Sequence, residues 1–412
     1  MRAYRMVLVL VLVAGQWACD DDTVIPPPPS PEWESMASGT SRELNAVWAA
    51  SSDDAFAVGA EGTILRFDGR DWDPMFSGTA ADLHGVWGTS GNHVIATGDQ
   101  GTILVFDGGA WDPVTGVTTD PIGSVTGIDA NNLVAVGGGP PGSFLVFDGV
   151  EWTVRSTGDS QTLADALMIP PGGGSLLVGA AGTMFVAGPD TVTAIATGTT
   201  SNLNAILGTT AEDVIAVGDD GTVLAINFDA FPPDVREISG TSTDLTGITM
   251  RGYNDLFLLG SGGSILAFDR CSTQPSKGSG ALLNDIAAVS SERVLAVGAD
   301  GTILTYTGPG PAACPDQVTV SVSGGLTPTF SWSPNCFVNL VLVEEQAGDM
   351  WVVEGDGNLI ESGVRYGDHH PCETGFWYEG PLLPGVEYDV ILFRYDEAVD
   401  DYTLIALETF TP

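Results

Sequence analysis

The sequence predicts an all-β chain in which a seven-bladed β-propeller, closed by an N-terminal strand, is followed by a β-sandwich. Three observations support this prediction: a repeat of about forty residues, apolar residues that alternate with a period of two inside each repeat, and an orphan strand before the first repeat. Repeats of this length are typical of propeller blades or solenoid units, and short alternating runs between Gly, Asp and Asn turns favour blades.

The repeat is marked by a Gly that ends one apolar strand and by a second Gly that precedes the next. Its first copy runs from Ala57 to Gly69, and four copies continue from the second Gly as Gly-Thr-Ile-Leu or Gly-Thr-Val-Leu. The first Gly recurs at steps of 39, 39, 42, 39, 42 and 38 residues, which predicts seven blades. These glycines are Gly59, Gly98, Gly137, Gly179, Gly218, Gly260 and Gly298.

Each repeat is predicted to fold into four strands, which in the first copy are residues 44–49, 55–58, 63–67 and 71–76. Gly62 should close the second hairpin, and Asp68-Gly69 should form a two-residue turn with positive φ at both positions. The same Asp-Gly pair returns at 107–108 and 148–149. A Trp follows each pair, and we expect these rings to pack between blades rather than to stack on a sugar: Trp72, Trp111 and Trp152.

The last repeat lacks its fourth strand, because a Gly-Pro-rich segment follows residues 301–306. Residues 32–36, followed by Ser38-Gly-Thr40, match residues 71–75, followed by Ser77-Gly-Thr79. An N-terminal strand would therefore complete the seventh blade and close the ring, which removes the exposed sheet edges of an open array. A linear solenoid has no use for this permutation. We expect the propeller to span residues 32–310.

The pattern Val-Gly-x-x-Gly-Thr-Ile-Leu-x-Phe-Asp-Gly-x-x-Trp resembles the repeats of photosystem-assembly-factor-type propellers and, more loosely, the Asp-box propellers of bacterial envelope proteins. This resemblance concerns the fold. Sialidases with Asp-box propellers need an arginine cluster, a tyrosine nucleophile and a helping glutamate, whereas the arginines of this chain are scattered without pattern. Sialidase activity is therefore disfavoured.

The repeat stops before residues 311–412, where about seven short apolar runs predict a β-sandwich. The segment from Leu382 to Tyr388 resembles the tyrosine corner of fibronectin type III domains, and Trp332 stands where that family places its core tryptophan. The resemblance implies a fibronectin- or immunoglobulin-like accessory domain.

The first residues predict export. Arg2 and Arg5 precede an apolar run, residues 6–14, that is too short to span a bilayer, so residues 1–18 are interpreted as a signal peptide. The step from Ala18 to Cys19 resembles a bacterial lipoprotein cleavage site, which implies a lipidated Cys19. Acidic residues and the run of four prolines at 26–29 make residues 19–31 a stiff spacer. We expect a lipoprotein that crosses the inner membrane and faces the periplasm or exterior, held to the membrane by its lipid alone; the alternative is simple secretion with Cys19 free.

The charge is strongly negative, with 13 Lys and Arg against 53 Asp and Glu and a formal net charge of −40. Such a chain repels phosphate backbones, which disfavours nucleic acid as a partner. A solvated acidic surface that keeps the protein soluble and an attraction for cations or basic partners are both compatible with this charge.

Four cysteines besides Cys19 can pair in three ways in an oxidising compartment. The resemblance to fibronectin domains implies that Cys336 and Cys372 lie in loops at one end of the sandwich and pair with each other. Cys271 and Cys314 would then form the second disulfide.

Sequence motifs nominate no catalytic residue and no metal ligand. There is no His-Glu-x-x-His, no paired Cys spacing, and no Gly-x-Ser-x-Gly in a strand-to-helix context. One group is a candidate binding face or, alternatively, a set of ordinary turn residues. It consists of carboxylates in the turns between second and third strands, which should lie on one face: Glu61, Asp99, Asp219, Asp220 and Asp300.

These observations favour a monomeric, non-enzymatic binding or scaffold lipoprotein that presents its propeller to an envelope protein or glycan. The alternative is a secreted polysaccharide-active enzyme, a glycosidase or lyase, because acids are abundant although no motif singles out a catalytic pair. No cofactor is expected, apart from structural calcium at Asp-rich turns as a further hypothesis.

Overall fold

The computed structural model describes residues 33–307, with gaps at 138, 140–141, 170–173, 211–212, 229–233, 238–240, 253–254, 269–272, 279 and 291–292, and eight strands between 319 and 410. The predicted signal peptide and spacer lie outside the described residues. So do Cys19, Cys271, Cys314, Cys336 and Cys372, so that the lipid anchor and both disulfides stay predictions.

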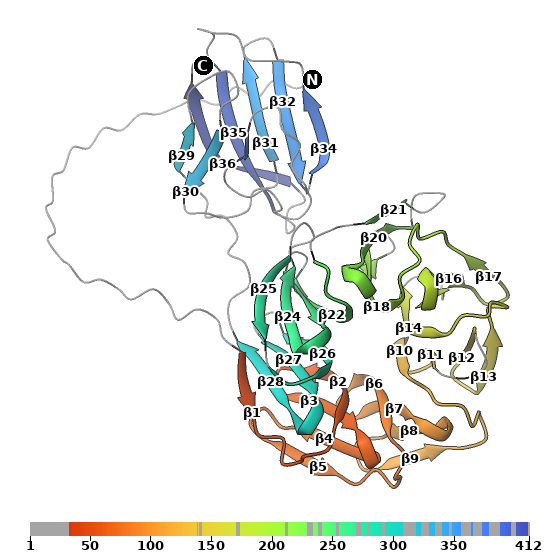
Figure 1. Cartoon of the computed structure of the whole chain (residues 1–412). Coiled ribbons are helices and arrows are strands. Elements are labelled where there is room, and N and C mark those ends of the chain that lie inside the picture. The colour runs from red at the N-terminus through yellow and green to blue at the C-terminus, as the bar shows by residue number, and fades with distance from the viewer. Residues whose placement is uncertain are drawn as a thin grey trace, which may run out of the picture. The chain divides into compact units, whose positions relative to one another are not determined.

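The described part of residues 33–307 forms seven four-stranded antiparallel sheets, which confirms the predicted all-β, seven-bladed propeller (Figure 1). In each sheet of the first six blades the strands follow one another in chain order. The first strand of each blade lies against the first strands of both neighbouring blades, so these strands form the inner wall of the ring.

The strand bounds of the first six blades follow the repeat. Blade 1 holds β2 (Leu44–Ser51), β3 (Asp54–Gly59), β4 (Thr63–Phe67) and β5 (Trp72–Met75). Blade 2 holds β6 (Leu83–Ser90), β7 (His93–Gly98), β8 (Ile103–Phe106) and β9 (Trp111–Val114), and blade 3 holds β10 (Ser124–Asp129), β11 (Asn132–Val136), β12 (Ser143–Phe147) and β13 (Trp152–Ser156). Blade 4 holds β14 (Leu163–Ile169), β15 (Gly174–Gly179), β16 (Met184–Ala187) and β17 (Val192–Ala194), and blade 5 holds β18 (Leu203–Thr210), β19 (Asp213–Gly218), β20 (Val223–Asn227) and β21 (Asp234–Glu237). Blade 6 holds β22 (Leu245–Gly252), β23 (Asp255–Gly260), β24 (Ser264–Phe268) and β25 (Thr273–Gly278).

Blade 7 is built from both ends of the propeller sequence, as the orphan segment predicts. It holds β26 (Leu283–Ser290), β27 (Arg293–Gly298) and β28 (Ile303–Thr307), and its outer strand is β1 (Trp33–Met36). In the register of this pair Trp33 lies opposite Tyr306. Trp33 is buried, its Nε1 donates a hydrogen bond to Ser276 Oγ at 3.0 Å, and its ring meets Phe257 edge-on at 5.7 Å. The closing strand therefore binds blade 6 as well as blade 7.

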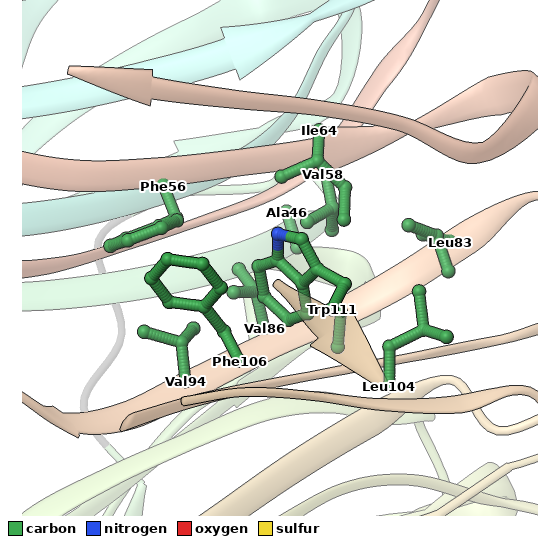
Figure 2. Close-up of a cluster of buried hydrophobic side chains, with 11 residues drawn as sticks. Ala46, Phe56, Val58, Ile64, Leu83, Val86, Val94, Leu104, Phe106 and Trp111 are labelled. Atoms are coloured by element: carbon green, nitrogen blue, oxygen red, sulfur yellow. The ribbon is translucent and has the colours of Figure 1, made fainter. Parts of the chain in front are cut away.

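The core of the propeller consists of apolar clusters between neighbouring blades. Trp111 of blade 2 lies among Phe56, Val58 and Ile64 of blade 1, with the Phe56 and Trp111 rings 6.2 Å apart at 81° (Figure 2). Trp72 packs in the same way against Leu295 of blade 7. The predicted position of these tryptophans between blades is confirmed, and each blade depends on its neighbours for burial of its apolar faces.

The prediction of a two-residue Asp-Gly turn is wrong. Phe67 pairs with Trp72, so four residues connect β4 to β5, and only Gly69 of the pair has a positive φ, of 95°. Asp68 Oδ1 instead accepts hydrogen bonds from the backbone N–H groups of Arg70 and Asp71, at 2.9 and 2.8 Å. These bonds hold the pKa of Asp68 below its usual value. The turn is longer because the carboxylate satisfies two backbone donors.

The C-terminal region contains two antiparallel sheets. One has the order β29 (Thr319–Val322), β30 (Thr329–Ser333) and β33 (Val364–Arg365). The other has the order β34 (Glu373–Tyr378), β32 (Gly348–Gly355), β31 (Leu340–Glu345), β35 (Tyr388–Asp396) and β36 (Asp401–Phe410). The short strand β33 was not expected. Tyr388, the predicted corner tyrosine, is buried at the first position of β35, and Trp332 lies on β30 opposite Val320.

Candidate binding face

The five predicted carboxylates lie in three-residue turns between the second and third strands of their blades. Five of the six described turns, all but that of Asp99, contact the first strand of the next blade along the ring, so these turns leave the propeller at one end. We call this end the turn face. Its turns are η1 (Ala60–Gly62), η2 (Asp99–Gly101), η3 (Ala180–Gly182), η4 (Asp219–Gly221), η5 (Ser261–Gly263) and η6 (Ala299–Gly301).

The five carboxylates occupy two different positions in these turns. Asp99 and Asp219 stand at the first position and are half-buried, whereas Glu61, Asp220 and Asp300 stand at the second position and are exposed. The backbone at the second position is left-handed, with φ of 54°, 58° and 53° for the three exposed acids. The sequence therefore identified the turns but not this difference between their carboxylates.

The two first-position carboxylates are bonded to polar side chains that precede or begin the inner strands. Asp99 Oδ1 lies 3.0 Å from His84 Nε2. Asp219 accepts hydrogen bonds from Asn202 Nδ2 at 2.7 Å and from Asn204 Nδ2 at 2.8 Å. Because their oxygens already have partners within the protein, Asp99 and Asp219 are less available to a ligand than the three exposed acids.

The following blade holds each turn in place. Asp82 Oδ1 accepts a hydrogen bond from Glu61 N at 2.7 Å, and Asp244 Oδ1 accepts one from Asp220 N at 2.9 Å. A Cβ on Gly62 would lie 2.2 Å from Thr79 O, so the connection to the next blade packs directly against the turn. The second-position acids therefore stand on rigid backbone.

Asparagine side chains connect successive inner strands just below these turns, a feature that the sequence analysis missed. Asn45 Nδ2 donates to Leu83 O at 2.8 Å, and Asn284 Nδ2 donates to Leu44 O at 2.9 Å across the closure of the ring. Asn204 makes the equivalent bond to Leu245 O at 2.8 Å. The repeated Leu-Asn dipeptide at the start of the first strand was the available signal.

Two further carboxylates lie on the inner wall and were also missed. Asp165 accepts hydrogen bonds from Ser124 Oγ of blade 3 at 2.7 Å and from Ile206 N of blade 5 at 3.0 Å. Asp285 is the equivalent residue of blade 7. Burial raises the pKa of Asp285 to about 7, hydrogen bonds oppose the rise, and the Asp165 carboxylate adds to it. Burial also raises the pKa of Asp165.

Several arginines serve the packing of the blades. The Arg66 guanidinium of blade 1 lies 5.7 Å from the centre of the Phe106 ring of blade 2, and Arg251 of blade 6 lies 4.8 Å from that of Tyr306 of blade 7. Arg251 is almost fully buried and forms an ion pair with Asp255 at 2.6 Å. A guanidinium over the face of an aromatic ring, within about 6 Å of its centre, is attracted to the ring by a cation–π interaction. Arg66 and Arg251 therefore hold neighbouring blades together.

Within the described residues, no group of three His, Cys, Asp or Glu side chains is arranged to hold a metal ion. Structural calcium at the turns stays a prediction. In the same part of the chain, no helix has the length and apolar character needed to cross a bilayer.

Comparison with known proteins identifies the fold. No protein-family model matches the sequence, and no curated protein matches it. Among solved structures, YCF48 bound to a D1 peptide aligns with a TM-score of 0.55 and 15% identity over 67% of this chain and 95% of that one. YCF48 from Cyanidioschyzon merolae aligns with a TM-score of 0.55 and 17% identity over 67% and 98% of the two chains. The WD40 propeller domain of Doa1 aligns with a TM-score of 0.59 and 13% identity over 67% and 97%.

The chain shares its fold with these propellers. At this level of identity the likeness concerns the fold alone, and it agrees with the resemblance to photosystem-assembly-factor-type repeats.

Proposed function

We propose that the chain is a non-enzymatic scaffold protein of the cell envelope whose turn face binds a protein partner. The observation that carries this proposal is that Glu61, Asp220 and Asp300 are exposed at the second position of their turns, where the backbone is left-handed. Gly262 occupies the same position in blade 6 with φ of 74°, and glycine adopts this conformation without strain. Gln100 and Ala181 have the same conformation in blades 2 and 4, so it is a property of the repeated turn, which in three blades holds an exposed carboxylate on a fixed backbone.

The charge of the turn face indicates that the partner is a basic polypeptide. The exposed acids and a net charge of −40 would attract a positively charged surface over long distances, with an effect that weakens as salt is added. The YCF48 structure with a D1 peptide is an example of a propeller of this fold that binds a polypeptide. This example supports a protein rather than a glycan as the ligand.

The envelope setting rests on the predicted signal peptide and on the predicted lipidation of Cys19, which would attach the chain to a membrane. The C-terminal region is proposed to be a fibronectin type III-like accessory domain. Its sheet orders, β29-β30-β33 and β36-β35-β31-β32-β34, support this proposal. One sheet combines the first, second and fifth of the described strands, while the other combines the last two with the third, fourth and sixth. The buried Tyr388 at the start of β35 is further support.

The proposal is tested by reversing the three exposed charges and measuring capture of partners. The soluble chain from Asp20 carries Glu61→Lys, Asp220→Lys and Asp300→Lys, and the proteins that it retains from envelope extract are quantified against wild type. The control carries Asp71→Lys, Asp112→Lys and Glu151→Lys, which change the net charge equally at exposed sites on outer strands and turns. We expect the turn-face variant, but not the control, to lose the retained proteins. Equal retention by both would contradict the proposal.

The alternative function is tested on the same preparation. A glycosidase or lyase would release new sugar ends from polysaccharide, whereas a scaffold would not. Degradation of a polysaccharide by the wild-type chain at a rate above that of buffer alone would overturn the non-enzymatic assignment.

A further inference from the structure

A pocket of about 310 Å³ lies at the edge of the turn face, on blade 1. It is bordered by the connection from blade 7 to blade 1 (38–42), by the turn that carries Glu61, and by the end of β5 with the segment that follows it (74–79). Its volume reaches the lower end of the range for small-ligand and side-chain pockets. One of the three exposed acids of the turn face thus belongs to the lining of a concave site.

The two loops that form the walls use their own polar atoms internally. Ser38 Oγ donates a hydrogen bond to Thr40 O at 3.1 Å, and Thr40 Oγ1 accepts one from Arg42 N at 3.1 Å. The second loop repeats this arrangement, with Ser77 Oγ donating to Thr79 O at 3.3 Å. The charged groups of the lining are Arg42 and Glu61, whose side chains pair at 2.7 Å and are 50% and 67% exposed. An ion pair this exposed is weak and exchanges readily.

Phe76 stands at the mouth of the pocket with 90% of its surface exposed. The matching position carries a small residue in three other blades, Ala37, Ser156 and Ala196, and an isoleucine, Ile238, in blade 5, so the blade does not need an aromatic ring there. Met75 and Pro74 extend the apolar border of the pocket. An exposed aromatic side chain beside a pocket and an exposed acid has the composition of an interface anchor.

We propose that this pocket is the anchor point of the turn face and that it takes an apolar side chain from a basic polypeptide segment. Phe76 and Met75 contact that side chain, and Glu61 exchanges Arg42 for a neighbouring Lys or Arg of the partner. The acids of the turn face, which complement a cationic segment, determine this choice of partner over a neutral glycan. The inference rests on the proposed function and adds to it the chemistry of the bound segment.

The test measures binding of a fluorescent synthetic peptide of alternating Lys and Leu to the soluble chain from Asp20, by anisotropy. Phe76→Ala is expected to weaken binding about tenfold or more, the effect of removing an interface anchor. Val150→Ala, a change at a side chain of blade 3 that is 86% exposed, is expected to leave binding unchanged. Because both side chains are exposed, neither variant should alter the melting temperature, and a control melt separates loss of binding from loss of folding.

Arg42→Gln provides a second readout that a merely structural role would not produce. If Arg42 competes with the partner for Glu61, its removal should strengthen peptide binding by about two- to fivefold, in line with the small free energy of an exposed ion pair. Glu61→Gln should weaken binding by a similar factor. A decrease in affinity for Arg42→Gln, or no effect of Phe76→Ala, would overturn the pocket assignment.

The outcomes separate this inference from the proposed function. Peptide binding that is abolished by the triple charge reversal but unaffected by Phe76→Ala would leave the turn face in place and remove the pocket. No binding of the Lys-Leu peptide to wild type would remove the pocket inference alone, since retention of envelope proteins tests the proposed function separately. Displacement of the bound peptide by neutral oligosaccharides would overturn the inference and reassign the pocket to glycan.

Discussion

Asp285 Oδ2 accepts a hydrogen bond from Val47 N at 2.8 Å, so a carboxylate of blade 7 is bonded directly to the inner strand of blade 1. Its other oxygen, Oδ1, accepts a hydrogen bond from Ile286 N at 2.8 Å. One side chain thus satisfies two backbone donors of the inner wall at the place where the two ends of the ring meet.

The first prediction is a pH dependence of stability that Asp285 causes. Its pKa of about 7 lies above the value of about 3.9 for an unfolded Asp, so the folded state holds the proton more tightly. Stability should therefore fall as the pH rises from about 4 to about 7, by a few kcal/mol, since each pKa unit corresponds to about 1.4 kcal/mol. The free energy of unfolding, measured by urea titration at several pH values in this range, should fall less steeply with pH in Asp285→Asn than in wild type. Asp71→Asn serves as the exposed control, and equal slopes in all three proteins would refute the assignment.

The second prediction concerns the strained turn of blade 4. Ala181 has φ of 53°, a conformation that costs an L-residue about 1 to 2 kcal/mol. Glycine removes this strain but adds flexibility to the unfolded chain, so Ala181→Gly should raise the free energy of unfolding by about 0.5 to 1 kcal/mol. Ala180→Gly is the matched control one residue earlier, where φ is not positive, and it should lower stability. Denaturant titration of both variants decides; destabilisation by Ala181→Gly would be the contrary result.

The third prediction concerns the closing strand. Trp33 is 4% exposed and packs on Phe257 and Tyr306, so Trp33→Ala should cost about 3 to 5 kcal/mol. Glu34→Ala on the same strand removes an exposed side chain and should cost less than about 0.5 kcal/mol. Hydrogen exchange should show lost protection in β28 for the first variant alone. Unchanged protection there would mean that β1 contributes little to closure.

The fourth prediction concerns the contact of Arg66 with its aromatic neighbours. Its Nε and Nη2 atoms donate to the two oxygens of Asp54 at 2.8 and 2.9 Å, while its guanidinium faces Phe56 and Phe106. Lysine cannot reproduce this forked, stacked geometry, so Arg66→Lys should lower stability by about 1 kcal/mol. Arg70→Lys, at a side chain that is 88% exposed, is the control and should be neutral. Thermal melts that place both variants at the wild-type midpoint would exclude the stacked role.

The fifth prediction tests the lipid anchor. Wild-type chain should sediment with membranes and be released by detergent, because several acyl chains at Cys19 would give stable attachment. Cys19→Ser should instead appear in the soluble fraction. If the Ser variant stays in the membrane fraction, attachment does not depend on a lipid at this residue.

Most of the fold could be predicted from the sequence because a propeller repeats a local pattern. The spacing of the motif glycines gave the number of blades, and the matching segments at 32–36 and 71–75 gave the closure. The prediction of a two-residue turn at Asp68 and Gly69 is wrong because an Asp-Gly pair is equally compatible with a tight turn and with a longer one. In the longer turn the carboxylate accepts hydrogen bonds from the backbone. A dipeptide does not distinguish the two.

The inner-wall carboxylates could not be predicted because their partners belong to other blades. Asp165 meets Ser124 and Ile206, each 41 residues away, and only the closed ring brings the three inner strands side by side. In the sequence, an Asp on a strand reads as an exposed polar position. The pocket beside Phe76 was invisible for the same reason, because its walls come from the ends of two blades.

The closing strand also has a consequence for the order of folding. Trp33 leaves the ribosome early, yet its partner Ser276 lies 243 residues further along the chain, and β28 is synthesised later still. The first strand must wait unpaired while six blades are made, and contacts over such separations form slowly. A chain truncated before residue 303 would expose Trp33 and leave the edge of β27 that pairs with β28 without a partner strand, and such unpaired strand edges invite aggregation.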